Sequence, residues 1–297
     1  MQTTRTWHLD RPDGRRVAVH ELTPDAPADA PVVLLAHAAP GSGRFDPDPV
    51  ATAAHRVRLI APDRPGYGGS DPVPGGFATV DAAAADAAAV LGRVLPDGAT
   101  AGVVGWSAGG RVALAVAALR PELVGRVAAI GTPAPDEEVP WVGEDNRAAI
   151  DALRGTPAVD AHAALTGAFG PMLDAMTGDA RFGLVTDPVA DAAVLAEPRV
   201  ADRLRSMLDE ALASGSGGMV AEVAGYSLRP WGFEPSDVKA EVLLAYGAAD
   251  ALVGPAHGRW WLGVLPHARL EVLPDLGHLL VVPVWDRVLD HLGGRQR

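Results

Sequence analysis

The chain has 297 residues, of which 48% are hydrophobic and 21% charged, a globular composition that excludes a mainly disordered chain. It has no cysteine, which excludes disulfides, thiolate zinc sites, iron–sulfur clusters and a cysteine nucleophile. The formal net charge is −12, and Lys239 is the single lysine. A nucleic acid would therefore meet net repulsion, which argues against nucleic-acid binding.

The sequence shows no pattern typical of a signal peptide or of a membrane-spanning helix. The first sixteen residues hold no apolar core of signal-peptide length, and no stretch approaches the ~18 apolar residues of a membrane span. These features predict a cytoplasmic protein with no nucleic-acid and no membrane partner. A homodimer is compatible with them.

In chain order, two alternating runs, Thr6–Asp10 and Val17–Leu22, flank a turn sequence and predict an N-terminal β-hairpin. Unbroken apolar runs suit strands buried on both faces of a parallel sheet, and they occur at Val32–Ala36, Val57–Ala61, Thr100–Val104, Val127–Ile130, Val242–Tyr246 and Leu270–Leu273. Helices are predicted between or after them at Val80–Val94, Gly109–Leu119, Ala256–Leu265 and Trp285–Leu292. This alternation predicts an α/β fold with a mostly parallel central sheet and helices on both faces.

About a hundred residues between Pro133 and Pro235 break the alternation. They contain helical candidates and no convincing strand: Asn146–Leu153, Val159–Phe169, Pro188–Ala196 and Val200–Ala213, followed by an interruption at Ser214–Gly218. We predict a core domain at 1–134 and 236–297 with a helical cap or lid inserted at 135–235. The alternative is a second helical layer with no role in binding.

One motif carries chemistry: Gly105-Trp-Ser-Ala-Gly109 matches G-x-S-x-G. It lies between a predicted strand and a predicted helix, and a strand, a sharp turn and a helix together expose a serine hydroxyl on a strained bend. Glycine is needed at 105 and 109 because a Cβ there would collide with neighbouring backbone. The N-terminus of the helix also directs its dipole at a developing oxyanion. Ser107 is therefore the candidate nucleophile.

A serine nucleophile needs a base, and the base needs an orienting acid. After this type of turn the expected order is serine, then Asp or Glu, then His. Asp250 and His278 each follow a predicted strand, at the sheet edge where open parallel sheets place their sites. Asp136 is a second candidate for the acid, and we favour Asp250 because Gly-x-x-Asp-x-x-Val after a strand is the commoner pattern.

Two further motifs complete a series: His37-Ala-Ala-Pro-Gly-Ser42 and Asp63-Arg-Pro-Gly-Tyr-Gly-Gly-Ser70. With the turn at Ser107, Asp250 and Gly277-His278, they make the chain resemble, over nearly all its length, an α/β-hydrolase with a cap domain. The resemblance implies that Ser107 is the nucleophile, His278 the base and acid, and Asp250 the orienting carboxylate. It also implies an oxyanion hole formed by the amides of Ala108 and Ala39.

The family usually has glycine after the loop histidine, where this chain has Ala38. If that position needs a positive φ, alanine would strain the loop and misplace the Ala39 amide. Loss of one such donor lowers the rate on the order of 10²- to 10³-fold. We expect His37 to brace this loop through backbone hydrogen bonds rather than to act as a base.

The substrate pocket is predicted from apolar residues beside the nucleophile and in the cap: Trp106, Phe169, Met172 and Trp231. No metal and no cofactor are predicted, because the histidines checked for it show no metal-ligand spacing: His8, His20, His55, His162 and His291.

The candidate triad and the resemblance predict a serine hydrolase that cleaves a small or medium carboxylic ester or lactone through an acyl-enzyme. A serine argues against haloalkane dehalogenases and epoxide hydrolases, which use aspartate. Three serine-based alternatives remain: a C–C bond hydrolase, a cofactor-free perhydrolase, and a proline-releasing aminopeptidase in which Glu137, Glu144 or Glu222 would hold a free amine. A catalytically silent ligand-binding scaffold is an alternative of another class.

Overall fold

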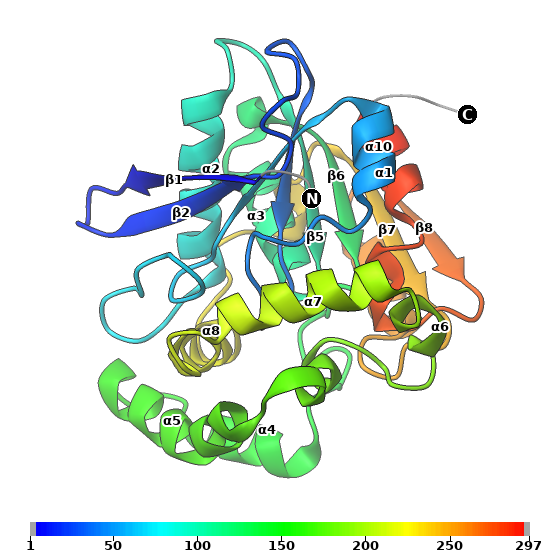
Figure 1. Ribbon diagram of the computed structural model, residues 1–297. Coiled ribbons are helices and arrows are strands. Elements are labelled where there is room, and N and C mark those ends of the chain that lie inside the picture. The colour runs from blue at the N-terminus through cyan, green and yellow to red at the C-terminus, as the bar shows by residue number, and fades with distance from the viewer. Residues whose placement is uncertain (1–3, 294–297) are drawn as a thin grey trace.

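One eight-stranded sheet forms the centre of the computed structural model, which describes residues 4–293 (Figure 1). The strand order is β1-β2-β4-β3-β5-β6-β7-β8. β1 (Arg5–Asp10) and β2 (Arg16–Glu21) form the predicted antiparallel hairpin, β2 is also antiparallel to β4, and every other neighbouring pair is parallel. The remaining strands are β3 (Val32–Ala36), β4 (Arg58–Pro62), β5 (Ala101–Trp106), β6 (Val124–Ile130), β7 (Glu241–Gly247) and β8 (Ala268–Leu273). The predicted α/β class is confirmed.

The helices of the core cover both faces of the sheet: α1 (Pro49–His55), α2 (Val80–Val94), α3 (Ala108–Leu119), α9 (Pro255–Val264) and α10 (Trp285–Leu292). The sequence reading missed α1. Its signal was present, because the Asp48 side chain accepts hydrogen bonds from the first amides of the helix and Pro49 occupies the first helical position.

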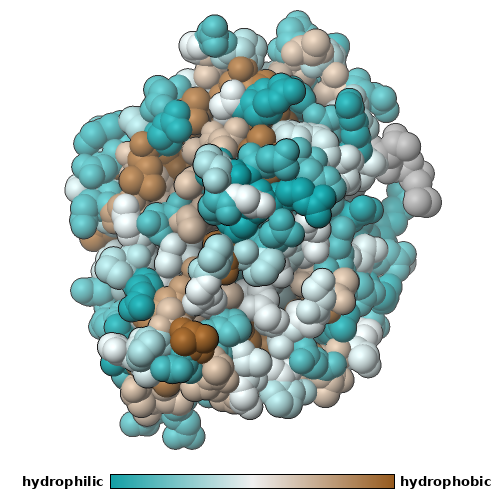
Figure 2. Space-filling model, turned by 90° about the vertical axis from the view of Figure 1, so that its left-hand side faces the viewer, coloured by the Kyte–Doolittle hydropathy of each residue, from teal (hydrophilic) through white to brown (hydrophobic). Residues whose placement is uncertain are grey.

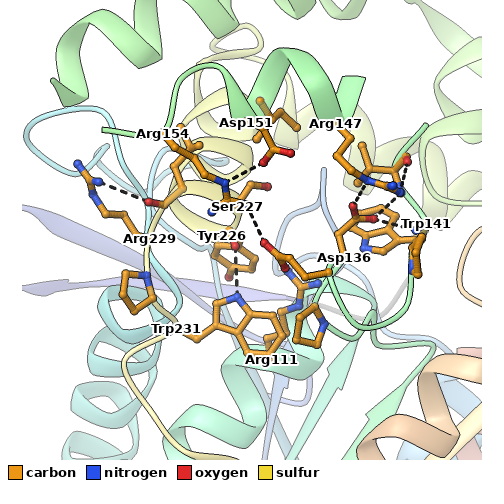
Figure 3. A pocket seen from close by; sticks show the side chains of 17 residues that line it. Arg111, Asp136, Trp141, Arg147, Asp151, Arg154, Tyr226, Ser227, Arg229 and Trp231 are labelled. Atoms are coloured by element: carbon orange, nitrogen blue, oxygen red, sulfur yellow. Dashed lines mark hydrogen bonds and ion pairs between the residues drawn. The ribbon is translucent and has the colours of Figure 1, made fainter. Parts of the chain in front are cut away.

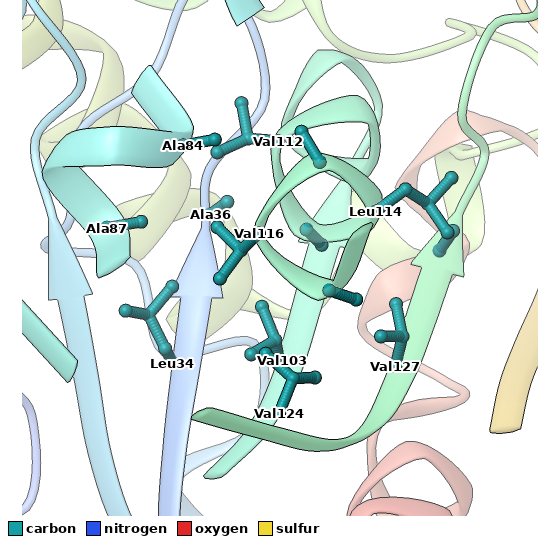
Figure 4. Packing of buried hydrophobic residues seen from close by; sticks show 14 of the residues in the cluster. Leu34, Ala36, Ala84, Ala87, Val103, Val112, Leu114, Val116, Val124 and Val127 are labelled. Atoms are coloured by element: carbon teal, nitrogen blue, oxygen red, sulfur yellow. The ribbon is translucent and has the colours of Figure 1, made fainter. Parts of the chain in front are cut away.

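Alternate residues of each central strand enter two separate hydrophobic clusters. In β3, Leu34 and Ala36 pack with α2 and α3 in the first cluster, whereas Val33 and Leu35 pack in the second, which includes residues of α1 and α10. Figure 4 shows the first cluster, with α3 lying over β3, β5 and β6. Side chains alternate between faces in a strand, so a strand buried on both faces must be apolar at every position. This explains the unbroken apolar runs.

The segment between β6 and β7 is helical in the structure and contains no strand. Its elements are α4 (Glu144–Asp151), α5 (Ala158–Ala175), the 3-10 helix η2 (Gly178–Leu184), α6 (Ala192–Leu195), α7 (Pro198–Ala211), α8 (Gly217–Leu228) and the 3-10 helix η3 (Pro235–Asp237). In Figure 1, α7 runs below the sheet, and α4 and α5 lie farther from it. We call residues 135–235 the inserted segment; its role as a cap remains a prediction.

The structure differs from the sequence reading most clearly at α8, which begins inside the interruption predicted at Ser214–Gly218. Close contact with the core explains the glycines. A Cβ on Gly218 would lie 2.4 Å from the carbonyl oxygen of Gly66, and one on Gly225 would lie 2.2 Å from that of Ala78. Glycine therefore serves close helix packing here, although locally it indicates a loop.

The surface seen in Figure 2 is mostly polar, with hydrophobic residues in small scattered patches. Within residues 4–293, no helix has the length and apolar character to cross a membrane.

Candidate active site

Ser107 occupies the sharp turn between β5 and α3. Its backbone has φ 55° and ψ −125°, one of three non-glycine residues with positive φ in residues 4–293. A Cβ on Gly105 would lie 2.2 Å from the carbonyl oxygen of Gly109, and a Cβ on Gly109 would lie 2.2 Å from that of Ala36. The steric reason given for these glycines is confirmed, and the serine hydroxyl is held on a strained turn.

The structure brings Ser107, His278 and Asp250 together. His278 begins the short 3-10 helix η4 (His278–Val281) beyond β8, and Asp250 follows β7. His278 Nε2 lies 2.9 Å from Ser107 Oγ, and His278 Nδ1 lies 2.8 Å from Asp250 Oδ2. With Nδ1–H donating to the carboxylate, Nε2 is free to accept the serine proton.

The other oxygen of Asp250 is fixed by its own loop. Oδ1 accepts hydrogen bonds from the amides of Leu252 at 2.8 Å and Val253 at 2.9 Å. Burial alone would raise the pKa of the Asp250 carboxyl, but the hydrogen bond and charge of His278, with these two amides, outweigh it and lower that pKa. Asp250 is therefore ionised at neutral pH, as an orienting carboxylate must be.

Asp136, the second candidate acid, binds groups other than His278. Its carboxylate accepts hydrogen bonds from the amides of Trp141 and Val142, each at 2.8 Å, and from Arg147. No hydrogen bond joins it to His278 among the described residues.

The two amides of the expected oxyanion hole come from the loop after β3, which carries Ala39, and from the first residue of α3, Ala108. Within residues 4–293, neither Ala39 nor Ala108 donates its amide to another protein group, so both remain available. Ala38 is not among the residues with positive φ, and the strain expected from alanine is absent. His37 Nδ1 donates to the Ala38 carbonyl at 2.8 Å, and His37 Nε2 accepts from the Arg64 amide at 3.0 Å. His37 thus braces the loop.

This geometry agrees with the comparison of the sequence with known families. A sequence model of the α/β hydrolase fold matches residues 31–282. The chain belongs to the α/β-hydrolase fold family.

Individual relatives of this α/β-hydrolase agree with that assignment. A pimeloyl-[acyl-carrier protein] methyl ester esterase of Aromatoleum aromaticum is 30% identical over 222 residues, covering 75% of this chain and 80% of that protein. A hydrolase from Pseudomonas aeruginosa has a TM-score of 0.70 at 20% identity and covers 98% of both chains. An esterase from Thermogutta terrifontis has a TM-score of 0.66 at 21% identity, covering 98% of this chain and 97% of that one. At such identities the two solved structures show a shared fold.

Arg64 connects the inserted segment to the loop after β3 that carries Ala39, which we call the oxyanion loop. Its guanidinium donates to the carbonyls of His37 and Ala38, and its Nη2 lies 2.9 Å from both carboxylate oxygens of Glu222 on α8. Arg64 and Glu222 are each 4% exposed. Although burial alone would lower the pKa of Arg64, the negative charge of Glu222 beside it raises that pKa. A buried ion pair therefore fixes the loop that carries Ala39.

The four residues predicted to bind substrate do not gather in one pocket. Trp106 is 1% exposed, packs beside His278 and donates Nε1–H to the His278 carbonyl at 2.9 Å. Phe169 packs within the inserted segment, and Met172 is exposed. Trp231 alone lines a described cavity. The common pocket is thus not seen, because Trp106 faces the cluster of α1 and α10 and α5 turns Met172 towards solvent.

That cavity has a volume of about 500 Å³ and none of the candidate triad residues lines it. Figure 3 shows it between α4 and the segment around Trp231, with Arg111 of α3 at its floor. Arg147 pairs with Asp136 beside it, and Arg154 pairs with Asp151. Most of the charged side chains that line the cavity thus form ion pairs with one another.

A metal-like cluster also occurs outside the triad. Within residues 4–293, His20, Asp63 and Glu210 have ligand-type atoms within 4.8 Å of one another. These groups already have protein partners: Asp63 binds His20 and the amides of Gly43 and Gly69, and Glu210 binds Ser42 and Arg44. The absence of a metal site stays a prediction.

Sequence reasoning missed two buried groups at the site. The sequence analysis assigned no role in catalysis to Arg64 or Asp191, yet each contacts a loop that carries a candidate site residue. His257 is also buried, and it accepts a hydrogen bond from the Ala134 amide. No local signal distinguishes these residues, because their partners come from distant elements.

Proposed function

We propose that this α/β-hydrolase is a serine esterase that hydrolyses a small or medium carboxylic ester or lactone through an acyl-enzyme. The observation that carries the proposal is the continuous hydrogen-bond chain from Ser107 Oγ through His278 to Asp250, with distances of 2.9 and 2.8 Å. Both lie within the range needed for proton transfer between nucleophile and base.

In the proposed reaction, Ser107 Oγ attacks the acyl carbon and its proton passes to His278 Nε2. Asp250 stabilises the imidazolium that forms. The negative charge on the former carbonyl oxygen is stabilised by the amides of Ala39 and Ala108. His278 then protonates the leaving alkoxide, and the C–O bond of the ester breaks. Water, deprotonated by the same imidazole, hydrolyses the acyl-enzyme and restores the Ser107 hydroxyl.

The substrate class rests on the relatives. The enzyme of Aromatoleum aromaticum is named for a methyl ester of a carrier-bound acyl group, and one structural neighbour is named an esterase. We infer an ester with a small alcohol as the leaving group, covered by the inserted segment acting as a cap. Ser107 is half-buried, which favours a substrate of limited size.

The aminopeptidase alternative loses two of its three candidate amine ligands. Glu222 already binds Arg64 through both oxygens, and Glu137 pairs with Arg154. The silent scaffold is disfavoured by the strained serine, since a ligand-binding protein has no evident need of a nucleophile held in this conformation.

The first experiment measures intact mass after exposure to a fluorophosphonate probe. The variants are Ser107→Ala and, as a matched control, Ser227→Ala in the inserted segment. One adduct on wild type and on Ser227→Ala, absent from Ser107→Ala, supports an activated serine at 107. No adduct on folded wild type would contradict the proposal, and an adduct on Ser107→Ala would identify another nucleophile.

A substrate panel then separates the reaction classes. We expect turnover of p-nitrophenyl esters of short acyl chains, with kcat lowered on the order of 10⁴-fold in Asp250→Asn. Faster cleavage of proline p-nitroanilide or of a 1,3-diketone than of any ester would instead favour the aminopeptidase or the C–C bond hydrolase. Peracid formation from ester and peroxide at a rate exceeding hydrolysis would favour the perhydrolase.

A further inference from the structure

A carboxylate of the inserted segment contacts the loop that carries His278. Asp191, just before α6, is completely buried, and its Oδ1 accepts a hydrogen bond from the Leu279 amide at 3.0 Å. Its Oδ2 accepts from the Asp187 amide at 2.7 Å, which closes the turn before α6. Figure 1 shows α6 beside the loops that follow β7 and β8. The backbone of Leu279, which follows the candidate base His278, is therefore held by a residue of the inserted segment.

The residue before the base meets the same carboxylate. A Cβ on Gly277 would lie 2.5 Å from Asp191 Oδ1 and 2.8 Å from its Cγ. Glycine at 277 thus lets the backbone approach Asp191 closely. Asp191 contacts the chain on both sides of His278, so the direction in which the imidazole leaves the backbone depends on it.

The burial of the Asp191 carboxylate lowers the stability of the folded protein, so stability does not explain its presence. Burial raises the pKa of the Asp191 carboxyl, and the amides of Asp187 and Leu279 offset this only in part. No arginine or lysine among residues 4–293 forms an ion pair with Asp191. A buried carboxylate without a cationic partner is unfavourable unless its hydrogen bonds are needed. The group that acquires positive charge in the proposed reaction is His278, and its charge lowers the pKa of Asp191.

We propose that Asp191 is a positioning residue for His278, and that the inserted segment thereby forms part of the catalytic apparatus as well as a cover. The proposal rests on the proposed function, in which His278 is the base. Asp191 touches no reacting atom; it holds the backbone at Gly277 and Leu279 so that Nε2 stays in line with Ser107 Oγ.

The test compares Asp191→Ala, Asp191→Asn and the control Asp174→Ala. Asp174 also lies in the inserted segment and accepts one backbone hydrogen bond, from Ser216 at 2.8 Å, away from the triad. A displaced catalytic group lowers the rate by about 10²-fold per ångström. We expect Asp191→Ala to lower kcat and the fluorophosphonate labelling rate by about 10- to 100-fold, with KM changed less than about threefold. The Asp191→Asn variant keeps an acceptor for Leu279 and should recover most of the loss.

Two results would overturn the proposal: wild-type kcat in a folded Asp191→Ala protein, or an equal loss in Asp174→Ala, which would show that the segment only needs to be intact. If Asp191→Ala does not fold, Asp191→Leu takes its place, because a side chain of similar volume also removes the acceptor for the Leu279 amide and the same loss of kcat is expected. A loss confined to KM would also refute positioning.

The proposed function is tested separately by the wild-type adduct at Ser107. If that adduct fails to form, positioning is still measured by proton NMR. The His278 Nδ1–H that donates to Asp250 should give a strongly downfield resonance in wild type and in Asp174→Ala. We expect it to broaden or disappear in Asp191→Ala, and an unchanged resonance would refute the proposal.

Discussion

Removing the charge of Glu222 should destabilise this protein far more than removing the charge of an exposed glutamate. Glu222 and Arg64 are each 4% exposed, and Gln at 222 would leave the Arg64 guanidinium buried without a counter-charge. Breaking a buried pair in this way typically costs about 3 to 5 kcal/mol. That is a large share of a total stability of roughly 5 to 15 kcal/mol, so we expect Glu222→Gln to lose about 3 kcal/mol.

The assay is urea unfolding followed by tryptophan fluorescence, with the free energy of unfolding extrapolated to water. The matched control is Glu137→Gln, the same change on the inserted segment, because the Glu137–Arg154 pair has side chains 65% and 49% exposed. An exposed pair contributes at most about 1 kcal/mol. If the two variants lose equal stability, the reasoning about burial is wrong.

A double variant separates stability from positioning. Arg64→Met with Glu222→Leu replaces the ion pair by apolar groups, which often restores or raises stability. The carbonyls of His37 and Ala38 would still lose the guanidinium that holds them. We therefore expect the double variant to unfold at a urea concentration near that of wild type, yet to turn over esters at least about 10-fold more slowly, up to the 10²- to 10³-fold of a lost oxyanion donor. A stable double variant with wild-type kcat would refute the role of Arg64.

Three further substitutions test other features of the structure. Burial raises the pKa of Asp46 to about 6, so its ionisation opposes folding as pH rises from about 4 to 7. Asp46→Asn should therefore add roughly 1 to 3 kcal/mol at pH 7 and nothing at pH 4, measured as the difference in Tm from wild type at each pH, and an equal gain at both pH values would refute this. Ala38→Gly should leave kcat unchanged and lower stability by about 1 kcal/mol, because Ala38 has no positive φ; a faster variant would show that alanine strains the loop. Ser107→Gly should be more stable than Ser107→Ala by about 1 kcal/mol in urea unfolding, since glycine removes the backbone strain, and a less stable glycine variant would mean that the turn stores none.

The sequence was most informative where local chemistry and position in the fold coincide. The runs at Val32–Ala36 and Val127–Ile130 are apolar at every position because their alternate side chains enter different clusters. The turn at Ser107 is recognisable because its two glycines meet backbone atoms within a few residues or on the next strand. Asp250 and His278 followed from the order of strands, since parallel strands end at one edge of the sheet.

Prediction failed where a residue's role depends on a distant element. Trp106 follows the same alternation as Val104, which turns its ring away from the serine beside it in the sequence and into the cluster of α1 and α10. The glycines of α8 indicate a loop until the approach of Gly66 and Ala78 is known. The sequence contains each of these residues, but their roles depend on how the inserted segment packs on the core.

The two buried carboxylates of the inserted segment, Glu222 and Asp191, do more than fill space in the core. Glu222 fixes Arg64, which holds the carbonyls of the oxyanion loop, and Asp191 holds the amide that follows His278. The segment therefore contacts the candidate site at two separate points, the loop that carries Ala39 and the residue after His278. A transplanted segment that lacks carboxylates at these positions would leave Arg64 without a counter-charge and the Leu279 amide without an acceptor. We therefore expect such a segment to change the rate of the chemical step as well as the choice of substrate.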